Sequence, residues 1–206
     1  ATGSDFIIMN DSPALELVDL NVDSLALTGG TDTNVSLTSA GSITVTNQVQ
    51  TLGTGTLFIE TTNTDADLVL NHNIQSETGS VTFETADDII FNGSSQLQSI
   101  SGAVMLTADA DNGAGGLFGG INMADGTLIN AGDGAVTLMA TDDITVGQII
   151  TNNNTDFAIH LETKGSVIDA GDNAGEDLIA NASGARVTII AALGAGKVAD
   201  FNGEIE

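Results

Sequence analysis

The sequence predicts an all-β protein built as a β-solenoid, in which short strands are stacked coil upon coil. Three observations predict it: a repeat of about 22 residues, strands that alternate apolar and polar residues, and bends rich in Gly, Asn, Asp and Thr. The repeat is plainest where AVTLMATDDITV, residues 135–146, nearly reproduces SVTFETADDIIF, residues 80–91. A fixed period of this length indicates a repeat architecture, because each unit buries its apolar face only against its neighbours.

Each copy of the repeat carries the same frame of apolar residues. Two apolar residues stand two positions apart, and a third follows eight positions after the first, directly behind a polar corner of two residues. This alternation is typical of short half-buried strands, and the corner residues are types that favour turns. Four stretches fit the frame: Val35, Leu37 and Ile43; Val81, Phe83 and Ile89; Val136, Leu138 and Ile144; and Ile159, Leu161 and Val167. Two more keep it with a longer first corner: Leu57, Ile59, Leu68 and Leu70; and Val104, Leu106, Ile121 and Met123.

The spacing of the copies fits a coil of two or three short strands and shows no helical periodicity. Their first apolar residues are 22, 24, 23, 32 and 23 residues apart, and the interval of 32 holds the insertion TADADNGAGGLFGG, residues 107–120. A unit this short is too small for a strand, a helix and a second strand, and an insertion confined to one corner is what stacked repeats tolerate. The 25 Gly residues and the single Pro agree with many tight bends.

The frame extends towards both ends of the chain, which predicts about eight coils in one elongated domain, residues 1–206. Residues 1–14 are predicted as a terminal strand, cap or partner strand, residues 15–190 as the coils, and residues 191–206 as the C-terminal edge. A degenerate last unit begins near Ile179 and reaches Val187 and Ile189. The predicted first coil is built from Leu15, Leu17, Leu20, Val22, Leu25 and Leu27.

A single coil is not stable alone, because both edges of each short strand present unpaired N–H and C=O groups. Stacking coils in parallel, about 4.8 Å apart, pairs these groups and buries the apolar residues in one column. Eight coils would then form a rod roughly 35 to 40 Å long.

Composition limits the partners. The formal charge is −25, from 28 acidic and 3 basic residues, so a nucleic-acid partner and an anionic membrane surface are excluded. The longest apolar runs fall far short of the roughly 18 residues that span a bilayer, so no membrane insertion is expected. Cysteine is absent, so no disulfides brace the fold. The start ATGSDFIIMN lacks the basic flank of a signal peptide, and any export signal is expected to have been removed or to lie outside this segment.

One corner of the repeat is a candidate calcium site. The pairs Asp87-Asp88 and Asp142-Asp143 occupy the same corner two coils apart, and the acidic insertion belongs to the coil between them. Ca²⁺ takes six to eight oxygen ligands from flexible loops. The candidate ligands are Asp87, Asp88, Asp109, Asp111, Asn112, Asp142 and Asp143. The alternative is that these aspartates serve only the bend, where Asp bonds to nearby backbone groups.

Other features argue against an enzyme. The two histidines are isolated, and none of the three cations, Lys164, Arg186 and Lys197, lies beside the acidic ridge in the repeat frame. Paired carboxylates on an exposed corner also lack the sheltered cleft of a glycosidase. Trp and Tyr, which stack on sugars, are absent. Leu117 and Phe118 in the insertion are a candidate contact site, unless the loop folds back and buries both.

The phrases GSITVTNQV, GAVTLMATDDITVGQII and GSVIDAGDNAGEDLIA resemble the degenerate repeats of very large bacterial exoproteins, the filamentous-haemagglutinin-like adhesins. The resemblance covers most of residues 15–190 and is a pattern of strand and bend without a catalytic motif. It implies a right-handed parallel β-helix, an extracellular or cell-surface location, and a role in adhesion or in a stalk or filament. This sequence departs from that family in showing no secretion domain or membrane-anchoring barrel.

These observations together predict a structural or adhesive segment of a bacterial cell-surface or extracellular protein. The end VADFNGEIE shows no capping helix, and DFIIMN near the start is a plausible partner strand, so we expect end-to-end stacking on another copy or on adjoining repeats. A surface receptor or a glycan is a further expected partner. The alternative function is a carbohydrate-binding or carbohydrate-cleaving β-helix.

Overall fold

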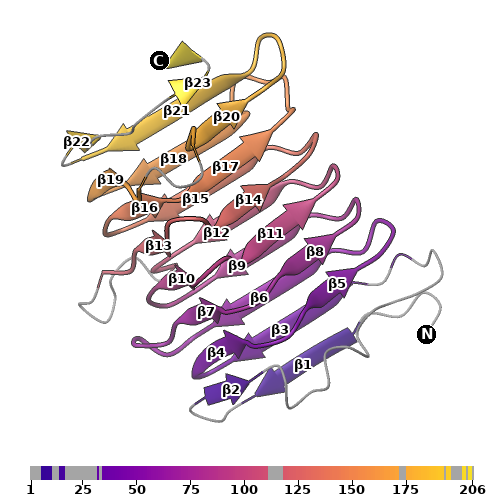
Figure 1. Cartoon of the computed structure of the whole chain (residues 1–206). Coiled ribbons are helices and arrows are strands. Elements are labelled where there is room, and N and C mark those ends of the chain that lie inside the picture. The colour runs from indigo at the N-terminus through magenta and orange to yellow at the C-terminus, as the bar shows by residue number, and fades with distance from the viewer. Residues whose placement is uncertain are drawn as a thin grey trace.

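The chain folds as a parallel β-helix, shown as a computed structural model in Figure 1. The structure describes residues 6–10, 14–16, 32, 34–110, 118–171, 175–192, 194–195, 201–202 and 204–205. All regular elements among these residues are strands, and all strand pairs are parallel. The predicted all-β solenoid is therefore confirmed.

The strands form three sheets, and each sheet receives one strand per coil. Sheet A contains, in spatial order, β1 (Phe6–Asn10), β3 (Val35–Ser39), β6 (Leu57–Thr61), β9 (Val81–Glu84), β12 (Val104–Thr107), β15 (Val136–Ala140), β18 (Ile159–Thr163), β21 (Arg186–Ala191) and β24 (Glu204–Ile205). Sheet B contains β2 (Ala14–Glu16), β4 (Ser42–Val45), β7 (Leu68–Leu70), β10 (Ile89–Phe91), β13 (Ile121–Met123), β16 (Ile144–Val146), β19 (Ser166–Asp169) and β22 (Gly194–Ala195). Sheet C contains β5 (Val49–Thr51), β8 (Ile74–Ser76), β11 (Gln96–Ser99), β14 (Leu128–Asn130), β17 (Gln148–Thr151), β20 (Leu178–Ala180) and β23 (Phe201–Asn202).

The predicted frame is confirmed residue by residue. In sheet A the first apolar residue of each copy pairs with that of the next, in the order Val35, Leu57, Val81, Val104, Val136, Ile159 and Val187. The third apolar residues pair in the same way in sheet B, in the order Ile43, Leu68, Ile89, Ile121, Ile144 and Val167. The insertion before Ile121 therefore leaves the register of both sheets intact.

The stack reaches both ends of the chain. β1, which lies within residues 1–14, predicted as a terminal strand, cap or partner strand, pairs with β3 and is the first described strand of sheet A. Leu15 of the predicted first coil lies in β2 and pairs with Ile43, whereas the coil's other predicted residues lie outside the described residues. Beyond residue 190, β22, β23 and β24 add one strand to each sheet.

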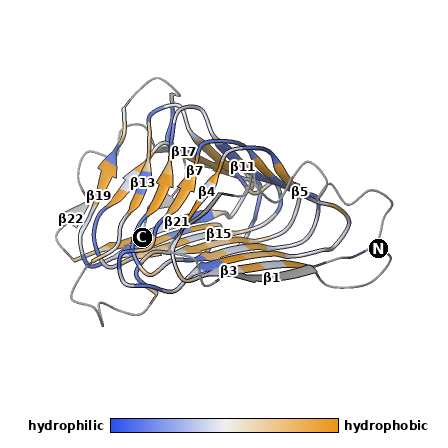
Figure 2. Cartoon of the chain, turned by 90° about the horizontal axis from the view of Figure 1, so that it is seen from below, coloured by the Kyte–Doolittle hydropathy of each residue, from blue (hydrophilic) through white to orange (hydrophobic). Residues whose placement is uncertain are grey.

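The core is the column that the three sheets enclose. Inward residues of the strands are buried and outward residues are partly exposed, and Figure 2 shows hydrophobic residues concentrated on the strands and hydrophilic ones at the bends. The two largest fully buried side chains, Phe83 and Phe91, come from sheets A and B of one coil. Because the interior continues through the stack, each coil packs on the coils before and after it.

Two bends contain buried hydroxyls that the hydrophobic frame does not predict. At the end of the sheet A strands, Gly41 N–H donates to Ser39 Oγ (3.2 Å), Thr85 Oγ1 donates to the Asp87 carbonyl (2.7 Å), and Gly165 N–H donates to Thr163 Oγ1 (2.9 Å). The end of the sheet C strands repeats the arrangement, for example between Ser76 Oγ and the Gly79 carbonyl (2.6 Å). These hydroxyls pair bend groups that would otherwise be buried without a hydrogen bond.

A glycine column marks the bend that enters sheet A. A Cβ atom at Gly79 would lie 1.9 Å from the Gly55 carbonyl oxygen, and one at Gly102 would lie 1.9 Å from the Gly79 carbonyl oxygen. A Cβ atom at Gly134 would likewise lie 2.1 Å from the Gly102 carbonyl oxygen. The backbones of successive coils approach so closely here that a side chain has no room.

Phe83→Ala should lower the free energy of unfolding by about 3–5 kcal/mol, because it leaves a cavity in the continuous core. The matched control is Phe58→Ala in the preceding coil, whose side chain is partly exposed on the outward face of β6. We expect the control to cost much less. Urea unfolding followed by far-ultraviolet circular dichroism measures both, since the chain has no Trp or Tyr. Equal costs for the two variants would contradict the assignment of inward and outward faces.

Candidate functional site: the acidic corner

The acidic corner is the bend at which the chain leaves sheet A and enters sheet B. The register of sheet B places one residue of each coil at the same point of this bend, directly before the first buried residue of the sheet B strand. These residues, which we call the corner column, are Ser42, Asp67, Asp88, Gly120, Asp143 and Ser166.

Side chains of the corner column bind the backbone of the following coil. Ser42, Asp67, Asp88 and Asp143 each contribute an oxygen that accepts a hydrogen bond from the N–H of the next column residue, as a short Ser or Asp side chain does in a turn. The bonds run from Asp67 N to Ser42 Oγ (3.0 Å), from Asp88 N to Asp67 Oδ1 (3.2 Å), from Gly120 N to Asp88 Oδ1 (2.7 Å) and from Ser166 N to Asp143 Oδ1 (2.7 Å). Of the aspartates expected to serve the bend, Asp88 and Asp143 therefore bond to nearby backbone.

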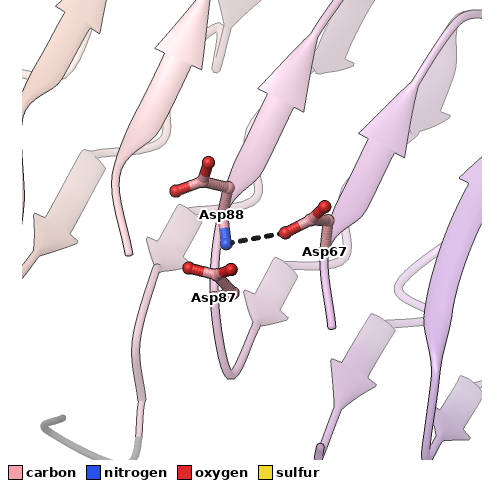
Figure 3. A group of neighbouring side chains, drawn as sticks. All are labelled: Asp67, Asp87 and Asp88. Atoms are coloured by element: carbon pink, nitrogen blue, oxygen red, sulfur yellow. Dashed lines mark hydrogen bonds between the residues drawn. The ribbon is translucent and has the colours of Figure 1, made fainter. Parts of the chain in front are cut away.

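Three carboxylates of this corner form a cluster, which Figure 3 shows. One oxygen each of Asp67, Asp87 and Asp88 lies within 4.8 Å of the others, and all three residues are partly buried. Asp67 comes from the coil before the Asp87-Asp88 pair and was missed by the sequence analysis. Its signal was present, because Asp67 precedes Leu68 as Asp88 precedes Ile89.

The crowding changes the acidity of the cluster. Burial raises the pKa of Asp87 to about 6, and the negative charges of Asp88, Asp67, Asp65 and Asp109 add to this effect. Burial also raises the pKa of Asp67, although the hydrogen bond from Asp88 N–H opposes the rise. The fold thus holds carboxylates together at a cost that a bound cation would relieve.

The other predicted calcium ligands are placed differently. Asp109 is 3% exposed, has a φ of 56°, and its carboxylate accepts a hydrogen bond from Thr141 Oγ1. Its backbone N–H donates to the Asp87 carbonyl (3.2 Å), so it lies against the cluster from the following coil. Asp111 and Asn112 lie outside the described residues.

Glycines separate the second acidic pair from the cluster. Asp142 and Asp143 belong to the same corner but to the second coil after Asp87-Asp88, and the coil between them carries Gly119 and Gly120. A Cβ atom at Gly119 would lie 2.3 Å from the Asp87 carbonyl oxygen, so no side chain fits there. The structure therefore joins Asp87 and Asp88 to Asp67 and does not join them to Asp142 and Asp143.

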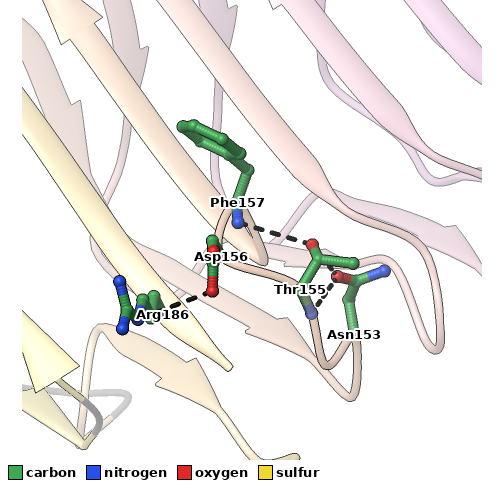
Figure 4. Close-up of polar contacts among 5 residues, drawn as sticks. All are labelled: Asn153, Thr155, Asp156, Phe157 and Arg186. Atoms are coloured by element: carbon green, nitrogen blue, oxygen red, sulfur yellow. Dashed lines mark hydrogen bonds and ion pairs between the residues drawn. The ribbon is translucent and has the colours of Figure 1, made fainter. Parts of the chain in front are cut away.

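The corner also carries a cation. Lys164 lies in the coil after Asp142 and Asp143, since Ser166 N–H donates to Asp143 Oδ1. The expectation that no cation lies beside the acidic ridge is therefore wrong for Lys164. It holds for Arg186, which begins β21 at the bend entering sheet A and pairs with Asp156 (3.6 Å; Figure 4). Lys197 lies outside the described residues.

Phe118 is the described half of the predicted contact pair, and Leu117 lies outside the described residues. The Phe118 side chain is 61% exposed and directly precedes Gly119 of the acidic corner. An exposed aromatic ring at this place is available for contact with a partner.

Comparisons with protein-family models, with curated proteins and with solved structures find no match to this chain. The described residues include no helix long and apolar enough to cross a membrane. The resemblance to filamentous-haemagglutinin-like adhesins consequently rests on the sequence phrases alone.

Asp87→Asn should flatten the pH dependence of stability. The pKa of Asp87 is about 6 in the fold and 3.8 as its ordinary value, so between these pH values the folded state keeps a proton that the unfolded state has lost. Stability of the natural chain then falls as the pH rises through this window and stays lower above it. We expect the melting temperature of the variant to exceed that of the natural chain above about pH 6 and to match it at about pH 4. Asp142→Asn is the control, and an equal gain there would contradict the assignment.

Calcium binding at the cluster remains a prediction with a direct test. Added Ca²⁺ should raise the melting temperature at neutral pH, because a ligand that binds only the folded state stabilises it. Asp88→Asn should abolish the rise. Asp143→Asn is the matched control, since Asp143 makes the same backbone contact outside the cluster. A melting temperature that does not respond to Ca²⁺, or a response that Asp88→Asn leaves unchanged, would contradict a calcium site here.

Proposed function

We propose that this chain is a structural segment of a bacterial cell-surface or extracellular rod, a stalk or filament of the adhesin type. The observation that carries the proposal is the unbroken axial register: sheets A, B and C run through the stack in chain order, with every strand parallel to its neighbours. Successive coils of such a stack are joined by backbone hydrogen bonds along the rod axis, so a pull along the axis is shared among three sheets.

The ends of the rod support its extension. Among the described residues, β1 and β24 are the outermost strands of sheet A, and each pairs with one neighbour. An outer strand presents N–H and C=O groups that can pair with another strand. We propose that these edges continue into further coils, contributed by a longer polypeptide or by another copy of this chain.

The negative net charge of the chain favours end-to-end association over side-by-side association. A formal charge of −25 spread along a short rod makes the long faces of two copies repel each other. End-to-end pairing brings together a smaller part of that charge and gains backbone hydrogen bonds. The exposed Phe118 offers a point at which such a rod would touch a receptor.

We assign no reaction to this chain. Two of the corner carboxylates bind the backbone of the next coil, since Asp67 accepts from Asp88 N–H and Asp88 accepts from Gly120 N–H. Cleavage of a carbohydrate chain therefore has less support than a structural role.

The proposed assembly should depend on salt. Raising NaCl from about 0.01 M to about 0.15 M shortens the Debye length from roughly 30 Å to roughly 8 Å, so association of these acidic rods should strengthen. Analytical ultracentrifugation should then show larger species, and electron microscopy should show rods in multiples of about 40 Å, the length of a nine-strand stack. Monomers at every salt and protein concentration would contradict self-stacking.

The direction of assembly can be read from cross-links, because the chain has no cysteine of its own. Mixing the variants Ile7→Cys in β1 and Glu204→Cys in β24 with a short bismaleimide should give dimers that join the two variants. Each variant alone is the control and should give few dimers. Equal yields from the mixture and from the single variants would contradict head-to-tail stacking.

A further inference from the structure

The outer face of sheet C carries a row of side-chain amides. Gln50, Gln75, Gln98 and Asn130 occupy the same register position in four consecutive coils. Adjacent strands of a sheet lie about 4.8 Å apart, so the row offers an amide at that interval along the rod axis. The coils that follow replace the amides with Ile150 and Ile179, and the row ends there.

A groove with a volume of about 640 Å³ lies against this row. The amide row forms one side, and residues two positions later on the same strands or bends, among them Leu52, Glu77 and Ile100, form the other. The nearly buried Ser76 and Ser99 lie between the two sides. The volume is in the range of sites that bind small ligands or short pieces of a polymer.

The amides are held in place by one another and keep bonding capacity. Gln48 Nε2 donates to Gln75 Oε1 (2.6 Å), Gln75 Nε2 donates to Gln98 Oε1 (3.3 Å), and Gln98 Nε2 donates to Gln96 Oε1 (2.7 Å). A side-chain amide has two N–H donors and an oxygen that accepts two bonds. These contacts use one donor and one lone pair of Gln75, so a donor and an acceptor remain for a ligand.

We propose that this groove binds a linear, neutral glycan chain that lies along the rod axis. Hydroxyl groups donate and accept hydrogen bonds as amides do, and a polymer repeats its hydroxyls along its length as the row repeats its amides. Glu77 and Asp133 line the groove and repel an anionic polysaccharide. Ile100, which is 62% exposed, and Leu52 offer apolar contact to the faces of sugar rings.

A peptide fits the groove less well. Extended peptides bind sheets by adding a strand to an unpaired edge. Three of the strands that carry the groove, β8, β11 and β14, each pair with a strand on both sides, whereas β5, which carries Gln50, is the outermost described strand of sheet C. Over β8, β11 and β14 only side chains are available to a ligand, so recognition there relies on the amides. The proposed glycan site adds a function to the rod and does not depend on whether the rod assembles.

The test is binding of defined oligosaccharides to the full chain, followed by isothermal titration calorimetry and by nuclear magnetic resonance of the oligosaccharide. The probes are the neutral oligomers cellohexaose, xylohexaose, mannohexaose and maltohexaose, with oligogalacturonate as the anionic comparison. We expect saturable binding of at least one neutral oligomer and none of the anionic one. The double variant Gln75→Ala/Gln98→Ala should weaken that binding by about tenfold or more, the loss expected for two hydrogen bonds.

Two controls keep the test specific. Gln148→Ala changes a glutamine of sheet C that does not line the groove, and should leave binding unchanged. Circular dichroism checks that the double variant is folded. The proposal is overturned if no neutral oligomer binds, if the double variant binds as tightly as the natural chain, or if Gln148→Ala weakens binding equally. It is also overturned if the double variant alters self-association in place of glycan binding, which would assign the groove to a second copy of the chain.

Discussion

The backbone hydrogen bond between one coil and the next is the constraint from which the rest of this structure follows. Each strand is only two to six residues long, so a coil has too little internal pairing to be stable. Pairing with the coils on both sides supplies the missing bonds and fixes the register at the same time. Once the register is fixed, every position of the repeat becomes a column that runs along the rod, and neighbouring coils must place compatible residues in it.

Columns explain residues that have no explanation within a single coil. Gly79, Gly102 and Gly134 lack a side chain because the backbone of the adjacent coil occupies the space where it would lie. Neutral hydroxyls and amides stack without penalty, because each donates to one neighbour and accepts from another, as Gln75 does. Carboxylates stack at a cost, because they only accept hydrogen bonds and repel one another. At Asp87, burial and then the negative charges of its neighbours raise the pKa. Glycines in the next coil interrupt the acidic column before it grows longer.

The sequence predicted the strands well and the site only in part, for one physical reason. A buried apolar position is required in every coil, so the frame from Val35 to Val187 repeats often enough to be recognised. A bend position has to be compatible only with the same position in the coils before and after it. Ser, Asp and Gly therefore all occur in the corner column, and no consensus residue marks it. Asp67 was missed for this reason, although aligning it with Asp88 through Leu68 and Ile89 would have found it. The buried hydroxyls were not predicted because Thr is common in strands, so its presence at an inward position indicates a strand and no bend contact.

Inward and outward columns have different roles: inward columns stabilise the stack, and outward columns form the surface that a partner can contact. Inward columns set the distance between coils, and substitutions there are costly because each residue contacts the coils before and after it. Outward columns have the same spacing between coils, but their residue types can vary because they do not pack in the core. One strand position therefore carries amides in four coils and isoleucine in the next two. A ligand that recognises an outward column must therefore be extended and repetitive, whereas a compact ligand meets only two or three equivalent groups. The partners that we propose for this chain, a polymer, an ion held at one corner or further coils, are consistent with this constraint.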